Sequence, residues 1–359
     1  MFVFVCVRCE TELTAPLSQV ALPVHARQKY GNGLQLPVLM EPGTFAVEPE
    51  PLGPPWRRRE ETGPGRAAAR GICAPDRALP DGAAGAVVIA PGDTRGTVLI
   101  PERRGGACCG FDGGDGPNMA CSACGLPVAS RIDDCSLWQA VWLAPSAVRR
   151  RPVEGADAGL SSWADLLAEG AGVSPSEPIA SWGEPFRAGD RWHWSPQWVA
   201  AAGQALAHLL MASRGQAVAV PDGMTATMFQ RALDTLPTGR PTRRAVLAGP
   251  GQPTRTADAD ILLVPSHPQT GKAWTPDTPA DLVPLPFEVW FRLVFPEPRL
   301  PVPTSGPLPD GFLRDDPPTP AVHDVFRIDW QVFERTLARL SPVRAPWLRE
   351  ITENLTQMY

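Results

Sequence analysis

Hydrophobic residues in the middle of the chain recur at the spacing of an amphipathic helix. The clearest helix is expected to begin after Ser195 as N-cap, with Pro196 at its first position, and to finish at Arg214 and Gly215. Its apolar face is formed by Trp198, Ala202, Ala205, Leu206, Leu209 and Leu210. Upstream, Ser161 or Ser162 is expected to cap a short helix, because Asp165 completes a capping box with Ser162.

Short apolar runs alternate with helical patterns after this helix. The expected elements are a strand over 216–220, a helix over 225–236, strands over 244–248 and 260–264, and a further strand over 287–295. A helix–strand–helix–strand order favours a small α/β layer with parallel strands. This part of the chain is therefore predicted to form an α/β domain over residues 151–295.

The first 150 residues show an extended pattern instead. Strands are expected over 2–7, 36–40, 44–47, 85–90 and 97–100, and a long loop over 48–80. Beyond the α/β domain, the segment 296–322 is rich in Pro and is predicted to be a linker or arm, and 323–359 is predicted to be helical. The expected fold class is α+β or mixed α/β, with a β-rich domain over 1–150.

Composition narrows the classes of function. The chain has 359 residues, 43 Pro, 33 Gly and a formal net charge of −5, which argues against a protein that mainly neutralises nucleic-acid phosphates. Lys29 and Lys272 are the only lysines, so almost every basic residue is Arg, a bias typical of a high-GC bacterial genome. No apolar run is long enough to span a membrane and no export signal is evident, so no membrane insertion and a cytoplasmic location are expected.

The eight cysteines carry the strongest chemical signal. Two CxxC turns, Cys6–Cys9 and Cys121–Cys124, each lie beside a strand-like run, and a CxxC turn places two thiolates on one side of a tight loop. Gly125 follows the second pair, where a positive φ is expected, and Glu10 occupies the equivalent place in the first. The arrangement resembles a zinc ribbon. The resemblance implies a structural Zn²⁺ on Cys6, Cys9, Cys121 and Cys124, with residues 14–118 as one long insertion between the two hairpins.

Other cysteine arrangements remain open at this stage. Cys108 or Cys109 could join Cys121 and Cys124, with Cys135 as a fourth ligand, which would leave Cys6 and Cys9 outside the site. A thiol–disulfide redox centre is a further reading, although no strand–CxxC–helix context of the thioredoxin type is present. Cys73 is most simply a small buried or loop thiol.

Familiar catalytic motifs are absent from the sequence. There is no GxSxG and no HExxH, and the stretch ending at Lys272 lacks two residues of a phosphate-binding loop. The best remaining candidates for an enzyme site are His193, within a Trp-rich segment, and Ser266 with His267, which follow a predicted strand.

A non-catalytic zinc protein with a protein partner is the function that the sequence favours. A closed four-thiolate site leaves no open ligand position, and the Pro-rich segments suit contacts with a partner. The alternatives are an enzyme with its site near His193, Ser266 and His267, and a nucleic-acid-associated zinc ribbon, which the net charge disfavours.

Overall fold

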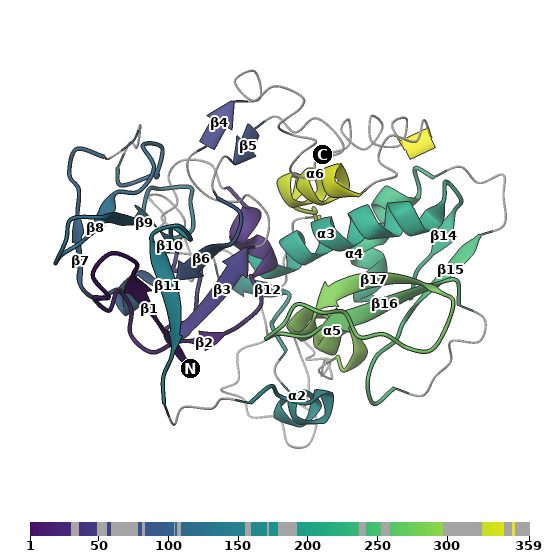
Figure 1. Ribbon diagram of the computed structural model, residues 1–359. Coiled ribbons are helices and arrows are strands. Elements are labelled where there is room, and N and C mark those ends of the chain that lie inside the picture. The colour runs from purple at the N-terminus through teal and green to yellow at the C-terminus, as the bar shows by residue number, and fades with distance from the viewer. Residues whose placement is uncertain are drawn as a thin grey trace, which may run out of the picture.

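The computed structural model describes most of the chain and places it in two packed regions (Figure 1). The described residues are 1–29, 36–48, 56–58, 78–80, 83–103, 105, 109–154, 159–170, 172–178, 192–236, 242–252, 259–296, 325–340 and 347–348. Helices and several sheets occur together, so the expected mixed α+β class is confirmed. Among the described residues, no helix is long and apolar enough to cross a membrane.

The first region, here called the β region, is built around a seven-stranded sheet. Its elements are β1 (Phe2–Cys6), β2 (Ser18–Gln19), η1 (Val24–Arg27), β3 (Thr44–Glu48), β4 (Trp56–Arg58), β5 (Ala78–Pro80), β6 (Ala86–Ile89), η3 (Pro91–Asp93), β7 (Thr97–Leu99), β8 (Met119–Cys121), β9 (Pro127–Ile132), β10 (Ala140–Leu143) and β11 (Val148–Pro152). The sheet order is β2-β3-β6-β10-β9-β8-β7, with only β2–β3 parallel. Strands from the segment between the two CxxC turns therefore share one sheet with β8–β10.

Side chains alternate between the two faces of this sheet, as the two-residue period of a strand requires. Phe45, Ile89 and Val141 pack on one face, and their neighbours on the same strands pack on the other. The pair β1–β11 covers the first face, with Phe2 opposite Pro152 in the register. The cysteines at the ends of β1 and β8 lie in this same core.

The second region, here called the α/β region, follows. Its elements are α2 (Trp163–Glu169), β12 (Ser176–Pro178), β13 (Trp192–Trp194), α3 (Pro196–Ser213), β14 (Val218–Ala219), α4 (Met224–Leu233), β15 (Arg243–Leu247), β16 (Ile261–Ser266), β17 (Asp281–Pro286), α5 (Phe287–Val294) and α6 (Trp330–Arg339). The strands β14 to β17 form a parallel sheet in sequence order. Helix α3 packs against both β17 and α6, and all three contribute to the largest core of the described residues.

Most expected elements of the α/β region are present. Ser162 and Asp165 form the predicted capping box of α2, and Gly170 ends that helix in the left-handed conformation. Helix α3 has Ser195 at its N-cap position and Pro196 at its first turn, as predicted, although the Ser195 side chain makes no capping hydrogen bond. Strands β15 and β16, helix α4 and helix α6 also lie where the pattern placed them.

Two expected strands are wrong. Residues 287–294 form helix α5 where a strand was expected over 287–295. Phe287 and Trp290, three positions apart, are buried, while Glu288 and Arg292, four positions apart, are not. The aromatic composition of this segment resembled that of a strand. Residues 36–40 form no strand, since only Val38 makes an isolated bridge, to Gln139.

The β region contacts the α/β region through η1 and the segment before it. The backbone N–H of Ala21 donates to the carbonyl oxygen of Pro268 at 2.8 Å, and Gln28 Nε2 donates to the carbonyl of Pro196 at 2.9 Å. η1 itself packs on α3 and α6. The expected Pro-rich segment 296–322 and most of the loop 48–80 lie outside the described residues.

Candidate metal centre

The two CxxC turns are local copies of each other, although 111 positions separate them in the sequence. In the first turn, Cys6 N–H donates to Thr11 O at 2.9 Å and Glu10 N–H donates to Cys6 O at 2.9 Å. In the second turn, Cys121 N–H donates to the carbonyl of residue 126 at 2.8 Å and the N–H of residue 125 donates to Cys121 O at 2.8 Å. The same pair of backbone hydrogen bonds thus shapes both loops.

The residue after each second cysteine takes a left-handed backbone conformation. Gly125 has φ +71°, and Glu10 in the equivalent place has φ +62°. A non-glycine residue seldom occupies this region, and holding it there costs about 1 kcal/mol. Glu10 therefore accepts the turn geometry that glycine takes without strain, and the first loop matches the second despite the difference in sequence.

The four sulfur atoms of these turns lie close to one another. Cys6 Sγ lies 3.6 Å from Cys124 Sγ, and Cys9 Sγ lies 3.5 Å from Cys121 Sγ. All four atoms are within 4.8 Å of one another. A tetrahedral zinc ion with bonds of about 2.3 Å would hold its sulfurs about 3.8 Å apart, so the donors and their spacing fit that ion.

The electrostatics of the cluster also fit a cation. Thr11 donates hydrogen bonds to Cys9 Sγ and lowers the pKa of that thiol to about 6. A backbone hydrogen bond from Leu126 lowers the pKa of Cys124, but burial and the neighbouring cysteines outweigh it and raise that pKa to about 12. Four thiolates so close together repel one another, and a divalent cation removes that repulsion.

A second cysteine cluster lies in the same region. Cys109 Sγ donates to Asp134 Oδ1 at 2.9 Å and accepts from the backbone N–H of Cys135 at 3.1 Å. These three residues form a group of their own, apart from Cys121 and Cys124. The alternative ligand set that joins Cys109 and Cys135 to the second CxxC turn therefore differs from the grouping in the structure. Cys73 and Cys108 lie outside the described residues.

The two aspartates before Cys135 anchor a loop. Asp133 Oδ1 accepts from the backbone N–H of Phe111 at 2.7 Å, and Asp134 accepts from that of Cys109 at 3.2 Å. Sequence reasoning had not connected Cys109 with Asp134. The signal that was available is the adjacency of Asp134 and Cys135, but the loop that brings Cys109 to them leaves no pattern in the sequence.

The proposed enzyme residues are only partly brought together. Ser266 and His267 line one cavity, whereas His193 lies on the β12–β13 ribbon opposite Glu177 and does not line it. Both ring nitrogens of His267 are engaged: Nε2 lies 2.9 Å from Ser161 O, and Nδ1 accepts the backbone N–H of Gln269 at 3.1 Å. His267 therefore anchors a loop and has no ring nitrogen available for a substrate.

An arginine-rich strand lies beside the first CxxC turn. Strand β11 carries three consecutive exposed arginines. Arg149 pairs with Glu10 at 2.6 Å and Arg151 pairs with Glu12, while Arg150 lies over the ring of Phe2. Because two of these three charges are neutralised by neighbours, the strand offers little free positive charge to a nucleic acid.

Comparisons with known protein families, with curated proteins and with solved structures give no match to this chain. What the site itself establishes is a cluster of four cysteines within metal-binding distance, assembled from two similar turns.

Proposed function

We propose that Cys6, Cys9, Cys121 and Cys124 bind one structural zinc ion. The observation that carries the proposal is the convergence of four sulfurs, in two crosswise contacts of 3.5 and 3.6 Å, from turns more than a hundred residues apart. Thiolate sulfur is a soft ligand that suits zinc in a tetrahedral site.

The ligand set favours a structural over a catalytic ion. Four thiolates fill the tetrahedral coordination of zinc, so no position is left for water or substrate. Two of the ligands, Cys6 and Cys121, are fully buried in the core of the β region. Because Cys9 is exposed and Cys124 is half-buried, the ion would lie at the surface end of this core, where it would support the fold.

The position of the site indicates what the ion would hold together. Cys6 ends β1, whose partner is β11, and Cys121 ends β8, whose neighbours are β7 and β9. One ion would tie the β1–β11 pair to the far end of the seven-stranded sheet. Its binding free energy would then be part of the folding free energy of the β region.

The wider role of the chain stays a prediction. A protein partner was inferred from the Pro-rich segments, and most of these lie outside the described residues. We propose a non-catalytic zinc protein that meets a partner protein in the cytoplasm. The nucleic-acid alternative is less favoured, because Arg149 and Arg151 on β11 are paired with Glu10 and Glu12.

Metal content tests the ligand assignment. The full chain, expressed with zinc and purified without chelators, is expected to contain one zinc per chain by inductively coupled plasma mass spectrometry. The double variant Cys6→Ser, Cys9→Ser should lose this zinc, because only two thiolates remain. The matched double variant Cys109→Ser, Cys135→Ser also removes two cysteines from the β region and should keep it. Full zinc in the first variant would overturn the assignment.

A further inference from the structure

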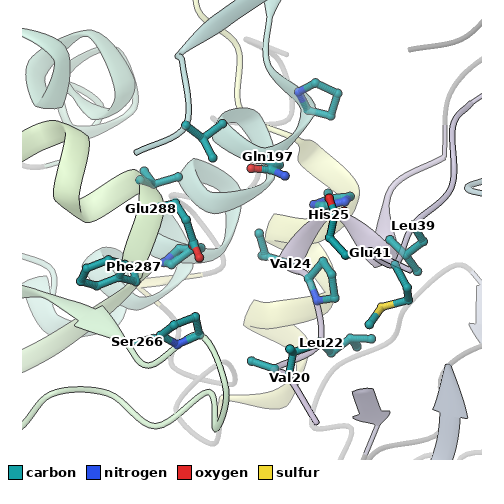
Figure 2. A pocket seen from close by; sticks show the side chains of 18 of the residues that line it. Val20, Leu22, Val24, His25, Leu39, Glu41, Gln197, Ser266, Phe287 and Glu288 are labelled. Atoms are coloured by element: carbon teal, nitrogen blue, oxygen red, sulfur yellow. The ribbon is translucent and has the colours of Figure 1, made fainter. Parts of the chain in front are cut away.

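A cavity of about 690 Å³ lies where the β region meets the α/β region (Figure 2). Residues 20–25 and 37–41 line it from the β region, and residues 266–268 and 286–289 line it from the α/β region. Figure 2 shows the side chains of Leu22, Val24 and Leu39 on one side of this space, with Phe287 and Glu288 across from them. The volume is that of a typical small-molecule site.

The α/β side of the cavity lies at the carboxyl ends of two strands of the parallel sheet. Strands β16 and β17 are parallel and both end there, at Ser266 and Pro286. Open α/β sheets bind ligands beyond the carboxyl ends of their strands. The first residues of α3 and α5, including Gln197 and Glu288, also line the cavity.

One lining side chain is a buried imidazole, that of His25, whose ring nitrogens make no hydrogen bond to another described residue. His25 on η1 is 6% exposed, and its imidazole packs edge to face on the ring of Trp138, with the two ring centroids 4.7 Å apart. Burial lowers the pKa of His25 to about 4, so the ring is neutral near pH 7. A buried polar ring normally finds a partner, and this one is placed to find it in a ligand.

Other polar side chains converge on the same space. Gln197 and Gln204 on α3 line it, and neither side chain has a partner within the part of the chain that the structure describes. Glu288 at the start of α5 extends into the open space in Figure 2. Burial raises the pKa of this carboxyl, which makes a charged partner for it favourable.

The charged side chains among the described lining residues are all acidic. Glu41, Glu177 and Glu288 line the cavity, and no Lys or Arg is among the described lining residues. Such a surface repels carboxylates and phosphates and attracts ammonium groups. The aromatic rings of Phe287 and Trp138 add apolar area that suits an organic body and can face a cation.

We propose that this cavity binds a small organic ammonium compound with an apolar body, whose ammonium group pairs with Glu288 and whose polar atoms reach His25 and Gln197. The site is separate from the cysteine cluster, and the proposal does not rest on the zinc. The cavity exists only when both regions are folded and packed together, because η1 supplies one wall and α5 supplies the other.

A matched ligand series tests the proposal on the full chain. Tryptamine, tryptophol and indole-3-propionate share an indole body and end in an ammonium, a hydroxyl and a carboxylate. By isothermal titration calorimetry, tryptamine should bind at least about tenfold more tightly than tryptophol, and indole-3-propionate should not bind at millimolar concentration. Equal binding of the amine and the carboxylate, or no binding of any of the three, would overturn the proposal.

Variants then locate the site. Glu288→Gln should weaken tryptamine binding about tenfold and leave tryptophol binding unchanged, because only the charge is removed. Glu41→Gln removes a second lining carboxylate and should weaken tryptamine binding less. Glu169→Gln, at the exposed end of α2 and outside the cavity, should change nothing. The circular dichroism spectra should coincide. Unchanged affinity in both lining variants would place the amine elsewhere and contradict the assignment.

Discussion

The β region and the α/β region assemble their strands in different ways. In the β region, β1 pairs with β11 and the two CxxC turns meet, so its two ends are joined by contacts across more than a hundred residues. In the α/β region, each strand of the parallel sheet pairs with the next one along the chain. The cores differ as well in how their residues are shared out: in the α/β region one large cluster, which includes α3 and α6, outweighs a small one around Leu262 and Val264, whereas the β region has two clusters of similar size, one on each face of its sheet.

This difference shows where an ion would matter. Contacts between distant segments carry a larger cost in chain entropy than contacts between neighbours, and a metal clamp offsets that cost. The α/β region has the largest core cluster among the described residues and pairs strands that follow one another along the chain, so we expect it to fold without such a clamp. Perturbing the cysteine cluster should therefore affect one region and leave the other largely intact, whereas perturbing the core of α5 should do the reverse.

The largest effect is expected from Cys121→Ser. Three thiolates then remain, and a structural zinc site in small domains contributes about 10 kcal/mol or more, which is comparable with the whole stability of a domain. The β region should lose its zinc and its cooperative melting transition in calorimetry, while the transition of the α/β region persists. The control is Cys109→Ser, outside the cluster. Loss of both transitions together would show that the two regions do not unfold separately.

The reverse test is Gly249→Ala in the α/β region. A Cβ atom at this position would lie 2.0 Å from Cζ2 of Trp290, which is fully buried and donates its indole N–H to Ala248 O at 3.0 Å. The overlap should destabilise this region by about 3 kcal/mol, measured by urea denaturation. Zinc content should stay at one ion per chain. The control is Gly92→Ala, where no atom lies within 4 Å of the added Cβ and no stability change is expected.

The boundary between the regions should be sensitive to pH through His25. Its pKa in the folded state is about 4, below the unfolded value of 6.5, so the unfolded chain binds the proton first as the pH falls. Stability contributed by the neutral ring is present above pH 6.5 and is lost between pH 6.5 and 4, by about 3 kcal/mol in total.

The raised pKa values of Glu288 and Asp329 act with the opposite sign, since those carboxyls favour folding when protonated. The measurement is therefore a difference: the free energy of unfolding of the wild type and of His25→Gln across pH 4–7. The free energy of unfolding of the wild type should fall relative to that of His25→Gln as the pH is lowered from 7 to 4. A constant gap would show that His25 does not change protonation in this window.

The smallest effect is expected from the ion pairs of β11. Arg151 and Glu12 are both about half exposed, and pairs of this kind contribute about 0.5 kcal/mol. Glu12→Gln should lower the stability of the β region by no more than this, and the loss should vanish at 1 M salt. A salt-independent loss of 2 kcal/mol would mean that the β1–β11 pair depends on these charges.

The α/β region could be predicted closely because its signals are local. Ser162 with Asp165 and Pro196 after Ser195 mark helix starts that need no distant partner. Strand β17 was not predicted, since it contains Pro284 and ends at Pro286. It is an edge strand of the sheet, where a missing N–H is tolerated.

The β region resisted prediction for the opposite reason. Nothing in the sequence states that β1 pairs with β11 or that β7 and β6 occupy distant places in one sheet. The CxxC turns are the exception, because their spacing indicates a shared ion even across a long separation. The cavity residues His25 and Glu288 were not predicted, since they line the same space only after η1 docks on α3.

The first ligand shell of the metal tests the central claim most directly. Zinc K-edge X-ray absorption of the purified full chain should show four sulfur neighbours at about 2.3 Å and no nitrogen or oxygen in that shell. That result would establish that the two turns, separated by 111 positions, bind one ion with all four thiolates. A shell of two sulfurs with nitrogen or oxygen ligands would contradict the account.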